Sequence, residues 1–372
     1  MMKTIKSIYT FRIALLVFVI TNLTFGKSIA QNISSSLEKE KMVSPSSVIY
    51  INNSVKNLEI HTWEQQQIKQ IVNIEITPVD PNEAKELLSQ FDFEIQSTVL
   101  GNIELEYDLG IEKMGEFTDK KIKTKKGEIT IVLKNGKVYT VKEINVSIIL
   151  FIPTNNELVL DSRFSSVSLG NLSNKVKLKL TNVNLKANNI DELELYASFS
   201  TVWFTSVNMA SFETTNCEVN IEKLRVAKIE SRFSRYNINT VQELNIDEAA
   251  SDTYNILNVD EIYCDNASFT NFNIRELKYL MNISSRNGDI KIENINEEFS
   301  QIDIDNSIST ITIGTLNIDE FVLNANTKYT KFNLSSNITP ITEVGKETYY
   351  KGSRMAKQKI NIDCVSCNVI IK

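Results

Sequence analysis

A seven-residue phrase recurs along the second half of this 372-residue chain, and its spacing restricts the possible folds. The phrase reads Asn, apolar, two mostly polar residues, apolar, one residue of either kind, apolar. It begins at Asn189, Asn220, Asn258, Asn273 and Asn317, with looser versions at Asn171, Ser206, Asn239 and Asn294. The mean interval is about 18 residues, and a fixed period of this size is typical of a solenoid.

The residue types inside the repeat indicate which kind of solenoid to expect. Short alternating runs of Ile, Val, Leu and Phe are separated by Asn, Ser, Thr and Asp, and helical spacing is absent. About 18 residues suit one lap of a parallel β-helix, with laps stacked about 4.8 Å apart. The alternative is an antiparallel β-sandwich, which explains the alternation but not the sustained period. We therefore predict an all-β fold, a parallel β-helix (β-solenoid) over residues 156–372 with capping strands at its C-terminal end, and parallel pairing from Glu157 to Ser336.

Three related stretches, which begin at Ser162, Ala197 and Ser231, show that alternate laps resemble each other. Strand parity predicts inward rows made of Ser165, Val167, Leu169, Ser200, Val202, Phe204, Ser234, Tyr236 and Ile238. Aromatic residues recur at every second lap, with smaller residues between them: Phe164, Phe199, Phe233 and Phe269, against Asn182, Asn216 and Asp252. We expect these phenylalanines to pack at the corners, and the alternative is an exposed stripe that grips a partner. The repeated asparagines are expected to form a hydrogen-bonded ladder rather than a ligand set.

The first half of the chain has a different organisation. Residues 1–30 carry basic residues, the apolar run Ile13–Ile20 and a small-x-small site that ends at Ala30, and this pattern predicts a signal peptide. Residues 31–47 are polar and patternless and are interpreted as a flexible leader. Residues 48–155 predict a β-rich capping region with one short helix over 81–91, because Asp80 can cap it and Pro81 suits its first position. Asn135-Gly136 between two alternating runs predicts a β-hairpin.

Charge and cysteine content limit the classes of partner. Removal of residues 1–30 deletes four cations and no acid, so the net charge falls from −6 to −10. That balance argues against nucleic acid as a partner. The lysine run Lys120–Lys126 is interpreted as a solvated hairpin face, with a patch for an anionic ligand as the alternative. No later segment is apolar enough to span a membrane. Cys217 and Cys264 are predicted to point inward and remain unbonded. Cys364 and Cys367 form a CxxC for which a local disulfide and free thiols both stay open.

No catalytic or metal-binding constellation is evident in the sequence. His61 is the sole histidine and is expected at the surface. No standard zinc spacing, phosphate loop or nucleophile elbow is present, so no catalytic, cofactor-binding or metal-binding residue is predicted. Acidic residues recur at one position of the phrase and are interpreted as a solvated stripe, with calcium binding or glycan cleavage as alternatives: Asp191-Glu192, Asp260-Glu261, Arg275-Glu276 and Asp319-Glu320.

Several of these features together resemble a known family. They are the exported leader, the segment Leu58–Trp63, the short helix, the junction FIPTNNELVLDSRFSSVSLGNL and the closing KINIDCVSCNVIIK. The chain is similar over residues 48–372 to the bacterial putative-adhesin β-solenoid proteins, which are related to auto-transporter adhesin head domains. It departs from them where Cys367 replaces the usual glycine. The resemblance implies an exported, non-enzymatic binding or structural module of the cell envelope, in the periplasm, on the outer membrane or outside the cell. Its surface ligand would be a glycan or a protein. The alternatives are a carbohydrate-active β-helix enzyme and an envelope sensor accessory protein.

Overall fold

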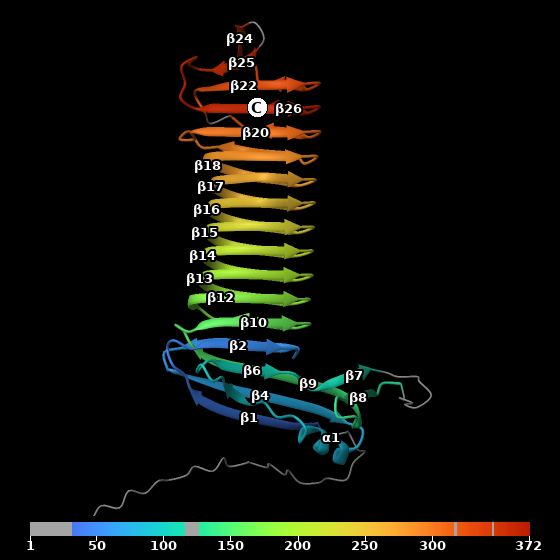
Figure 1. Ribbon diagram of the computed structural model, residues 1–372. Coiled ribbons are helices and arrows are strands. Elements are labelled where there is room, and N and C mark those ends of the chain that lie inside the picture. Colours follow the sequence, from blue (N-terminus) through green and yellow to red (C-terminus); the bar gives the residue numbers. More distant parts are fainter. Residues whose placement is uncertain (1–31, 116–125, 316–317, 344–345) are drawn as a thin grey trace, which may run out of the picture.

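The computed structural model describes residues 32–115, 126–315, 318–343 and 346–372. Within these ranges the chain forms one continuous, solenoid-like sheet of 27 mostly parallel strands and a single helix (Figure 1). The predicted signal peptide lies outside the described residues, as does the lysine run except for Lys126.

The central part of the molecule is a stack of long strands that pair in parallel (Figure 1). Leu185 lies opposite Val202, and Tyr236 lies opposite Tyr254, so successive laps repeat after 17 or 18 residues. The predicted parallel pairing is confirmed, and the β-sandwich alternative is wrong for this region. The strands are β10 (Glu157–Arg163), β11 (Ser166–Leu169), β12 (Leu172–Thr181), β13 (Asn184–Ser198), β14 (Thr201–Thr215), β15 (Glu218–Arg232), β16 (Arg235–Ala250), β17 (Thr253–Ser268) and β18 (Asn271–Arg286).

The C-terminal lap is inserted between two laps that precede it in sequence. Ile360 of β26 pairs with Ile302 on one side and with Leu323 on the other. The lap that contains β22 is therefore the outer one, and an antiparallel hairpin of β24 and β25 covers it. The elements at this end are β19 (Ile290–Ile295), β20 (Gln301–Ser307), β21 (Thr310–Ile313), β22 (Phe321–Lys328), β23 (Lys331–Leu334), β24 (Thr339–Glu343), β25 (Lys346–Lys351), β26 (Lys359–Val365) and β27 (Asn368–Ile371).

The N-terminal end has a similar arrangement. Ile49 of β2 pairs in parallel with Leu158 of β10 and with Ile103 of β6, so the lap made by β2 and β3 belongs to the stack itself. The sequence boundary expected near residue 155 is thus not a structural boundary. The strands are β2 (Val48–Asn53), β3 (Asn57–Trp63), β4 (Gln67–Pro78), β5 (Ile95–Ser97), β6 (Ile103–Tyr107), β7 (Ile111–Gly115), β8 (Ile129–Leu133) and β9 (Val138–Pro153).

The expected flexible leader is wrong over most of its length, because Ile33–Met42 form strand β1, which pairs antiparallel with β4. Ile33 and Leu37 are its partly buried apolar residues and pack on the core. Ser and Lys fill the other positions of the same face, so no apolar alternation is visible in the sequence. Backbone pairing with β4, rather than burial of side chains, therefore accounts for this edge strand.

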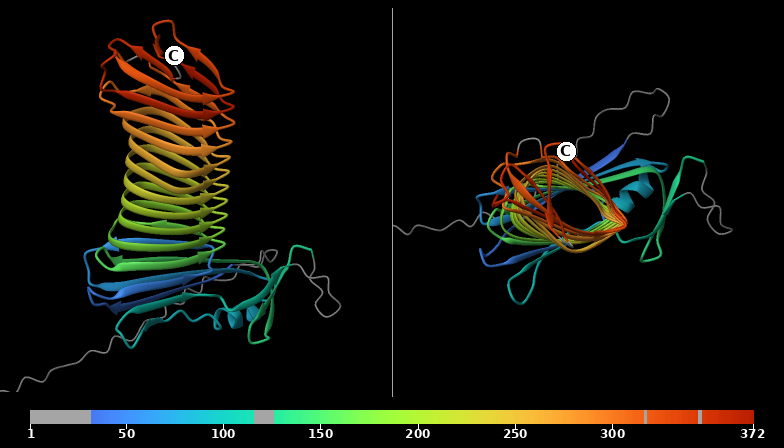
Figure 2. Two further views of the ribbon diagram at one scale, coloured as in Figure 1. Left: turned by 45° about the horizontal axis from the view of Figure 1, so that its top comes forward. Right: turned by 90° about the horizontal axis from the view of Figure 1, so that it is seen from above.

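Local turn chemistry accounts for the helix and the hairpin of the N-terminal region. Helix α1 (Pro81–Leu88) begins as predicted, because the Asp80 carboxylate accepts a hydrogen bond from the Asn82 amide at 2.7 Å. It ends three residues before the predicted Phe91. Gly136 has φ of 82° in the turn between β8 and β9, which confirms the hairpin. The α1, β7 and β8 region projects beyond the pointed corner of the stack, and we call it the foot (Figures 1 and 2).

The core is one continuous column of side chains inside the stack. All nine residues of the predicted inward rows are buried. Aromatic rings stack along the column, with the centroids of Tyr236 and Tyr254 5.1 Å apart and those of Tyr254 and Phe272 5.3 Å apart. Several laps must therefore form together, because each lap buries the rings of the next.

Candidate functional site

One corner of the stack is built from residues in the left-handed backbone region. Eleven described residues other than glycine have positive φ, between 51° and 62°, and all follow the end of a strand: Phe164, Asn182, Phe199, Asn216, Phe233, Ser251, Phe269, Asn287, Ile308, Tyr329 and Ser366. The turns lie one above another along one edge, which is pointed when seen from above (Figures 1 and 2). Such a φ is rare for bulky residues, and each instance costs about 1–2 kcal/mol.

A ladder of backbone hydrogen bonds gives the spatial order of these turns. The amide of each corner residue donates to the carbonyl just before the corner of the next lap, as in Phe164 to Thr181 and Phe233 to Ala250. At the far end Ile308 donates to Val365, and Ser366 donates to Lys328. Ser366 therefore lies between Ile308 and Tyr329, because the C-terminal lap is inserted there.

In this spatial order, large apolar and small polar residues alternate without interruption. Every second corner carries a large side chain, and we call these six residues the corner ridge: Phe164, Phe199, Phe233, Phe269, Ile308 and Tyr329. The five small residues between them are called the notches: Asn182, Asn216, Ser251, Asn287 and Ser366. Adjacent ridge residues are two laps apart, or about 9.6 Å. The ridge spans about 48 Å over ten lap spacings.

The ridge side chains are exposed, which corrects the prediction that the phenylalanines pack at the corners. Exposed fractions are 72% for Phe164, 60% for Phe199 and 62% for Phe269, and they reach 80% for Tyr329. The left-handed turn directs these side chains out of the stack, whereas strand parity alone had suggested packing. The alternative of an exposed aromatic stripe therefore describes the structure.

The turn itself is maintained by groups other than the ridge side chains. A hydroxyl commonly follows the corner and links neighbouring laps. The Ser200 hydroxyl accepts from the Val183 amide at 3.0 Å and donates to the Ser198 carbonyl at 2.8 Å. Because Asn and Ser notches make the same turn, a large apolar residue at this position contributes nothing that the turn requires.

The surface beside the ridge is hollowed and carries charges of both signs. A hollow of 540 Å³ runs beside the ridge over four successive laps, from Phe199 past Asn216 and Phe233 to Ser251. The residues immediately before the corners include four cations and no acid: Arg163, Arg232, Arg286 and Lys328. Acids lie behind this row, and Glu248 accepts from Arg232 at 3.0 Å.

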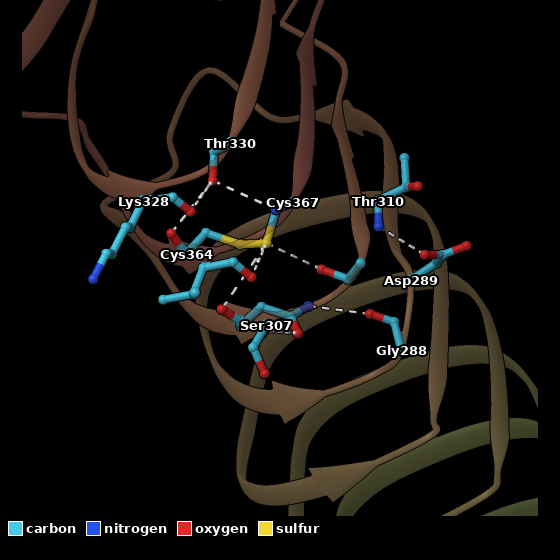
Figure 3. The surroundings of a disulfide bond; sticks show 11 residues. Gly288, Asp289, Ser307, Thr310, Lys328, Thr330, Cys364 and Cys367 are labelled. Carbon is cyan, nitrogen blue, oxygen red and sulfur yellow. Dashed lines mark hydrogen bonds between the residues drawn. A yellow bond between two sulfur atoms is a disulfide. The ribbon is translucent and has the colours of Figure 1, made fainter.

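Cys364 and Cys367 are joined by a disulfide across the corner of the C-terminal lap (Figure 3). Their Cα atoms are 6.1 Å apart and flank Ser366. In the lap of Phe164, the hydroxyls of Ser162 and Ser165 occupy the same two positions and are hydrogen-bonded at 2.7 Å. The disulfide thus closes covalently a corner that a hydrogen bond closes in another lap.

The other residues singled out in the sequence lie apart from the ridge. Cys217 and Cys264 are buried and free, as predicted, and burial raises the pKa of the Cys264 thiol to about 12. His61 is a surface residue, as predicted, and its ring stacks on Phe151 with centroids 5.2 Å apart. Its Nε2 lies 3.5 Å from a carboxylate oxygen of Glu59.

The acidic pairs do not form a single stripe. Glu192, Glu243 and Glu261 share one lap position, with two laps between the first and the second. Glu276 lies in another row, opposite Asn258. Among the described residues, no group of three or more His, Cys, Asp or Glu side chains is arranged to hold a metal ion. Tyr263 donates to Glu261 at 2.8 Å, and this bond and partial burial raise the pKa of Tyr263 to about 12.

The asparagine ladder exists, but its register differs from that of the sequence phrase. Asn220, Asn237, Asn255 and Asn273 are joined by side-chain hydrogen bonds of 2.9 to 3.0 Å. Asn189 belongs to a separate row, and the residue of its row in the lap of Asn220 is Lys223. The phrases at Asn220 and Asn273 were thus both aligned three residues out of register.

Sequence reasoning missed the two ridge members nearest the C-terminal end. Ile308 follows Phe269 after 39 residues, and Tyr329 is brought next to Ser366 only by the inserted lap. The available signal was the position of a large residue directly before Ser or Thr at a strand end.

Comparisons with known proteins give likeness to solved structures only. No family model matches the chain, and no curated protein matches it. A putative cell adhesion protein from Clostridium sporogenes is 12% identical with a TM-score of 0.22, and the match covers 91% of this chain and 100% of that one. A putative adhesin from Parabacteroides merdae is 9% identical with a TM-score of 0.30, and the match covers 70% of this chain and 97% of that one. A putative lipid binding protein from Parabacteroides distasonis is 11% identical with a TM-score of 0.30, and the match covers 74% of this chain and 93% of that one. These values assign no function. No helix among the described residues is long and apolar enough to cross a membrane.

Proposed function

We propose that this chain is an exported, non-enzymatic parallel β-helix with about 18 residues per lap, and that it serves as an adhesin-like binding or structural module of the cell envelope. The corner ridge is its contact surface. The observation that carries the proposal is the exposure of six large apolar side chains at left-handed corners, every second lap along the stack.

The physical cost of the ridge supports a role in binding. Each ridge residue adopts a backbone conformation that costs about 1–2 kcal/mol for a bulky L-residue, and strain of this kind is typical of functional positions. Each also leaves apolar surface in water, although Asn and Ser make the same turn in neighbouring laps. Neither folding nor solubility accounts for this choice, whereas burial against a partner does.

The placement of the acidic residues on the same side of the sheet supports a non-enzymatic role. Glycosidase carboxyl pairs act from opposite sides of a bond at about 5 to 9.5 Å. Glu243 and Glu261 lie side by side on one flat strand face, and Glu276 lies in a different row. Replacement of Asp260, Glu261, Asp319 and Glu320 by amides is expected to remove no lyase or hydrolase activity. Cleavage of an acidic polysaccharide by the wild type but not by this variant would establish the enzymatic alternative.

The direct test compares binding by the mature protein and by ridge variants on an array of glycans and matrix proteins. Phe233→Asn with Phe269→Asn introduces the residue that neighbouring corners carry, and should remove binding while the fold is retained. The matched control is Met209→Asn with Leu257→Asn, because both side chains are 42% exposed and lie off the ridge. Equal binding by both variants would contradict the assignment of the ridge.

A further inference from the structure

We propose that the partner of the corner ridge is a second copy of this chain, paired antiparallel so that ridge side chains of each copy enter the notches of the other. This inference rests on the ridge being the contact surface, as proposed above. It is carried by the uninterrupted alternation of large and small corner residues.

The spacing of the large side chains along the ridge favours a second copy as the partner. Large side chains occur about every 9.6 Å along the ridge, and a complementary surface must have depressions at the same interval. A second copy of the chain meets this condition, because its notches are spaced at the same interval as its ridge residues. An unrelated protein would have to match the interval by coincidence.

The second argument concerns symmetry. A twofold axis parallel to the stack would place Phe233 of one copy against Phe233 of the other. A twofold axis perpendicular to the stack, midway between two adjacent laps, places every large residue opposite a small one. That arrangement uses the same patch on both copies, so it closes at a dimer and does not continue into a fibre.

The third argument is the available space. The hollow beside the ridge, which extends from Phe199 to Ser251, has a volume of 540 Å³ and is lined by the two notch residues Asn216 and Ser251. This volume extends over both notches, so each of them has free space beside it for a side chain of a partner. The same alternation recurs on both sides of this hollow, so equivalent spaces are expected along the ridge.

The fourth argument is the amount of surface that pairing would cover. The exposed fractions of the six ridge residues lie between 60% and 80%. A large side chain presents about 150–250 Å², so the ridge offers roughly 600–1,000 Å² per copy. A stable protein interface of standard size buries about 800 Å² per partner. The ridge is thus large enough for a dimer.

Shape and charge disfavour the other partners. The foot projects past the pointed corner at one end of the stack, so a flat bilayer cannot touch the whole ridge (Figure 2). Two of the four cations beside the ridge are paired with acids of this chain, Arg163 with Asp161 and Arg232 with Glu248, so half of the positive charge that would attract an anionic surface is already balanced.

Sedimentation equilibrium of the mature chain over a wide concentration range tests the proposal. The wild type should form a dimer, and Phe233→Asn with Phe269→Asn should weaken it by roughly 100-fold or more, because a twofold axis doubles each loss. The control Met209→Asn with Leu257→Asn should dimerise like the wild type. Circular dichroism and thermal unfolding should show that each variant remains folded.

A second variant separates ridge-into-notch pairing from general stickiness. Ser251→Phe fills a notch with a side chain that the neighbouring corners Phe233 and Phe269 already carry. It adds apolar surface, so non-specific association would strengthen, whereas pairing into notches should weaken at least tenfold. A stronger dimer of Ser251→Phe would overturn the proposal.

The remaining outcomes also decide the question. A wild type that is monomeric at every concentration, or a dimer that survives Phe233→Asn with Phe269→Asn, overturns self-pairing. If the monomer is retained on insoluble polysaccharide and those substitutions abolish retention, the partner is a glycan and the proposed function stands. If a monomeric wild type also shows no ridge-dependent binding on the array, both proposals fail.

Discussion

Replacement of Cys364 and Cys367 by serine should loosen the C-terminal lap by an amount that can be worked out from the structure. The disulfide closes a loop of four residues across the corner at Ser366. In the chain-entropy model, such a closure contributes about 2 kcal/mol. Two serines at these positions reproduce the pair Ser162 and Ser165, whose hydroxyls are hydrogen-bonded at 2.7 Å. That bond should restore about 0.5–1.5 kcal/mol.

The expected net loss is therefore about 1 kcal/mol, and it should be local. Laps contact only their neighbours, so unfolding can begin at one end of a stack. Amide hydrogen exchange in β26 and β27 should become about fivefold faster, while exchange in β13 should not change. Cys364→Ala with Cys367→Ala provides the comparison, because alanine cannot form the hydrogen bond and should lose the full 2 kcal/mol or so.

Three results would refute this reasoning. One is equal exchange in the serine and alanine variants, which would mean that the hydroxyl pair contributes nothing. Another is faster exchange throughout the stack, which would contradict local unfolding. The third is the detection of two free thiols by mass spectrometry, before and after reduction, in protein from its own compartment that never met a reductant.

Three further predictions concern buried positions. Cys217→Ser should change the thermal midpoint little, because most neighbouring laps carry a hydroxyl in that row. Cys264→Ser should destabilise the protein by about 1–3 kcal/mol, because the neighbours of Cys264 in register are isoleucines. Equal losses of stability in the two variants would contradict this prediction. Gly288→Ala should destabilise by several kcal/mol in chemical denaturation, since its Cβ would lie 1.9 Å from a backbone carbonyl oxygen, while Gly170→Ala meets only contacts of 3.2 Å and should be mild. Burial raises the pKa of Asp252, so the stability of the wild type relative to Asp252→Asn should fall as pH rises from about 4 through the folded-state pKa; a rise with pH would show that the hydrogen bonds to this carboxylate outweigh its burial.

Features that depend on neighbours in sequence were predictable. Asp80 and Pro81 define the start of the helix, and Asn135-Gly136 defines a hairpin, because each acts over three or four residues. The parallel stack was also predictable, because the same period recurs many times along the sequence and each repeat is independent support for it. The single phrase at Asn220 was not sufficient to give its own register, because a degenerate pattern of alternating residues fits at more than one offset.

Features that depend on distant pairing were not predictable. Strand β1 lacks an apolar pattern, and its partner β4 provides the hydrogen bonds that order it. The side chain of Phe164 points outward because its φ is positive, and the sequence Arg-Phe-Ser does not indicate a positive φ. The place of Tyr329 in the ridge requires the inserted C-terminal lap, which joins residues far apart in the chain.

The position of the C-terminal lap has a consequence for the time course of assembly. A growing or emerging chain can add laps in order from β10 to β20, but β26 must then dock on β20 before β22 can take its final place. The outer lap therefore cannot reach its native contacts until residue 371 is available. Completion of the stack thus depends on the segment from Lys359 to Ile371, and a chain truncated before Lys359 would expose the edge of β20 to proteases and quality-control factors.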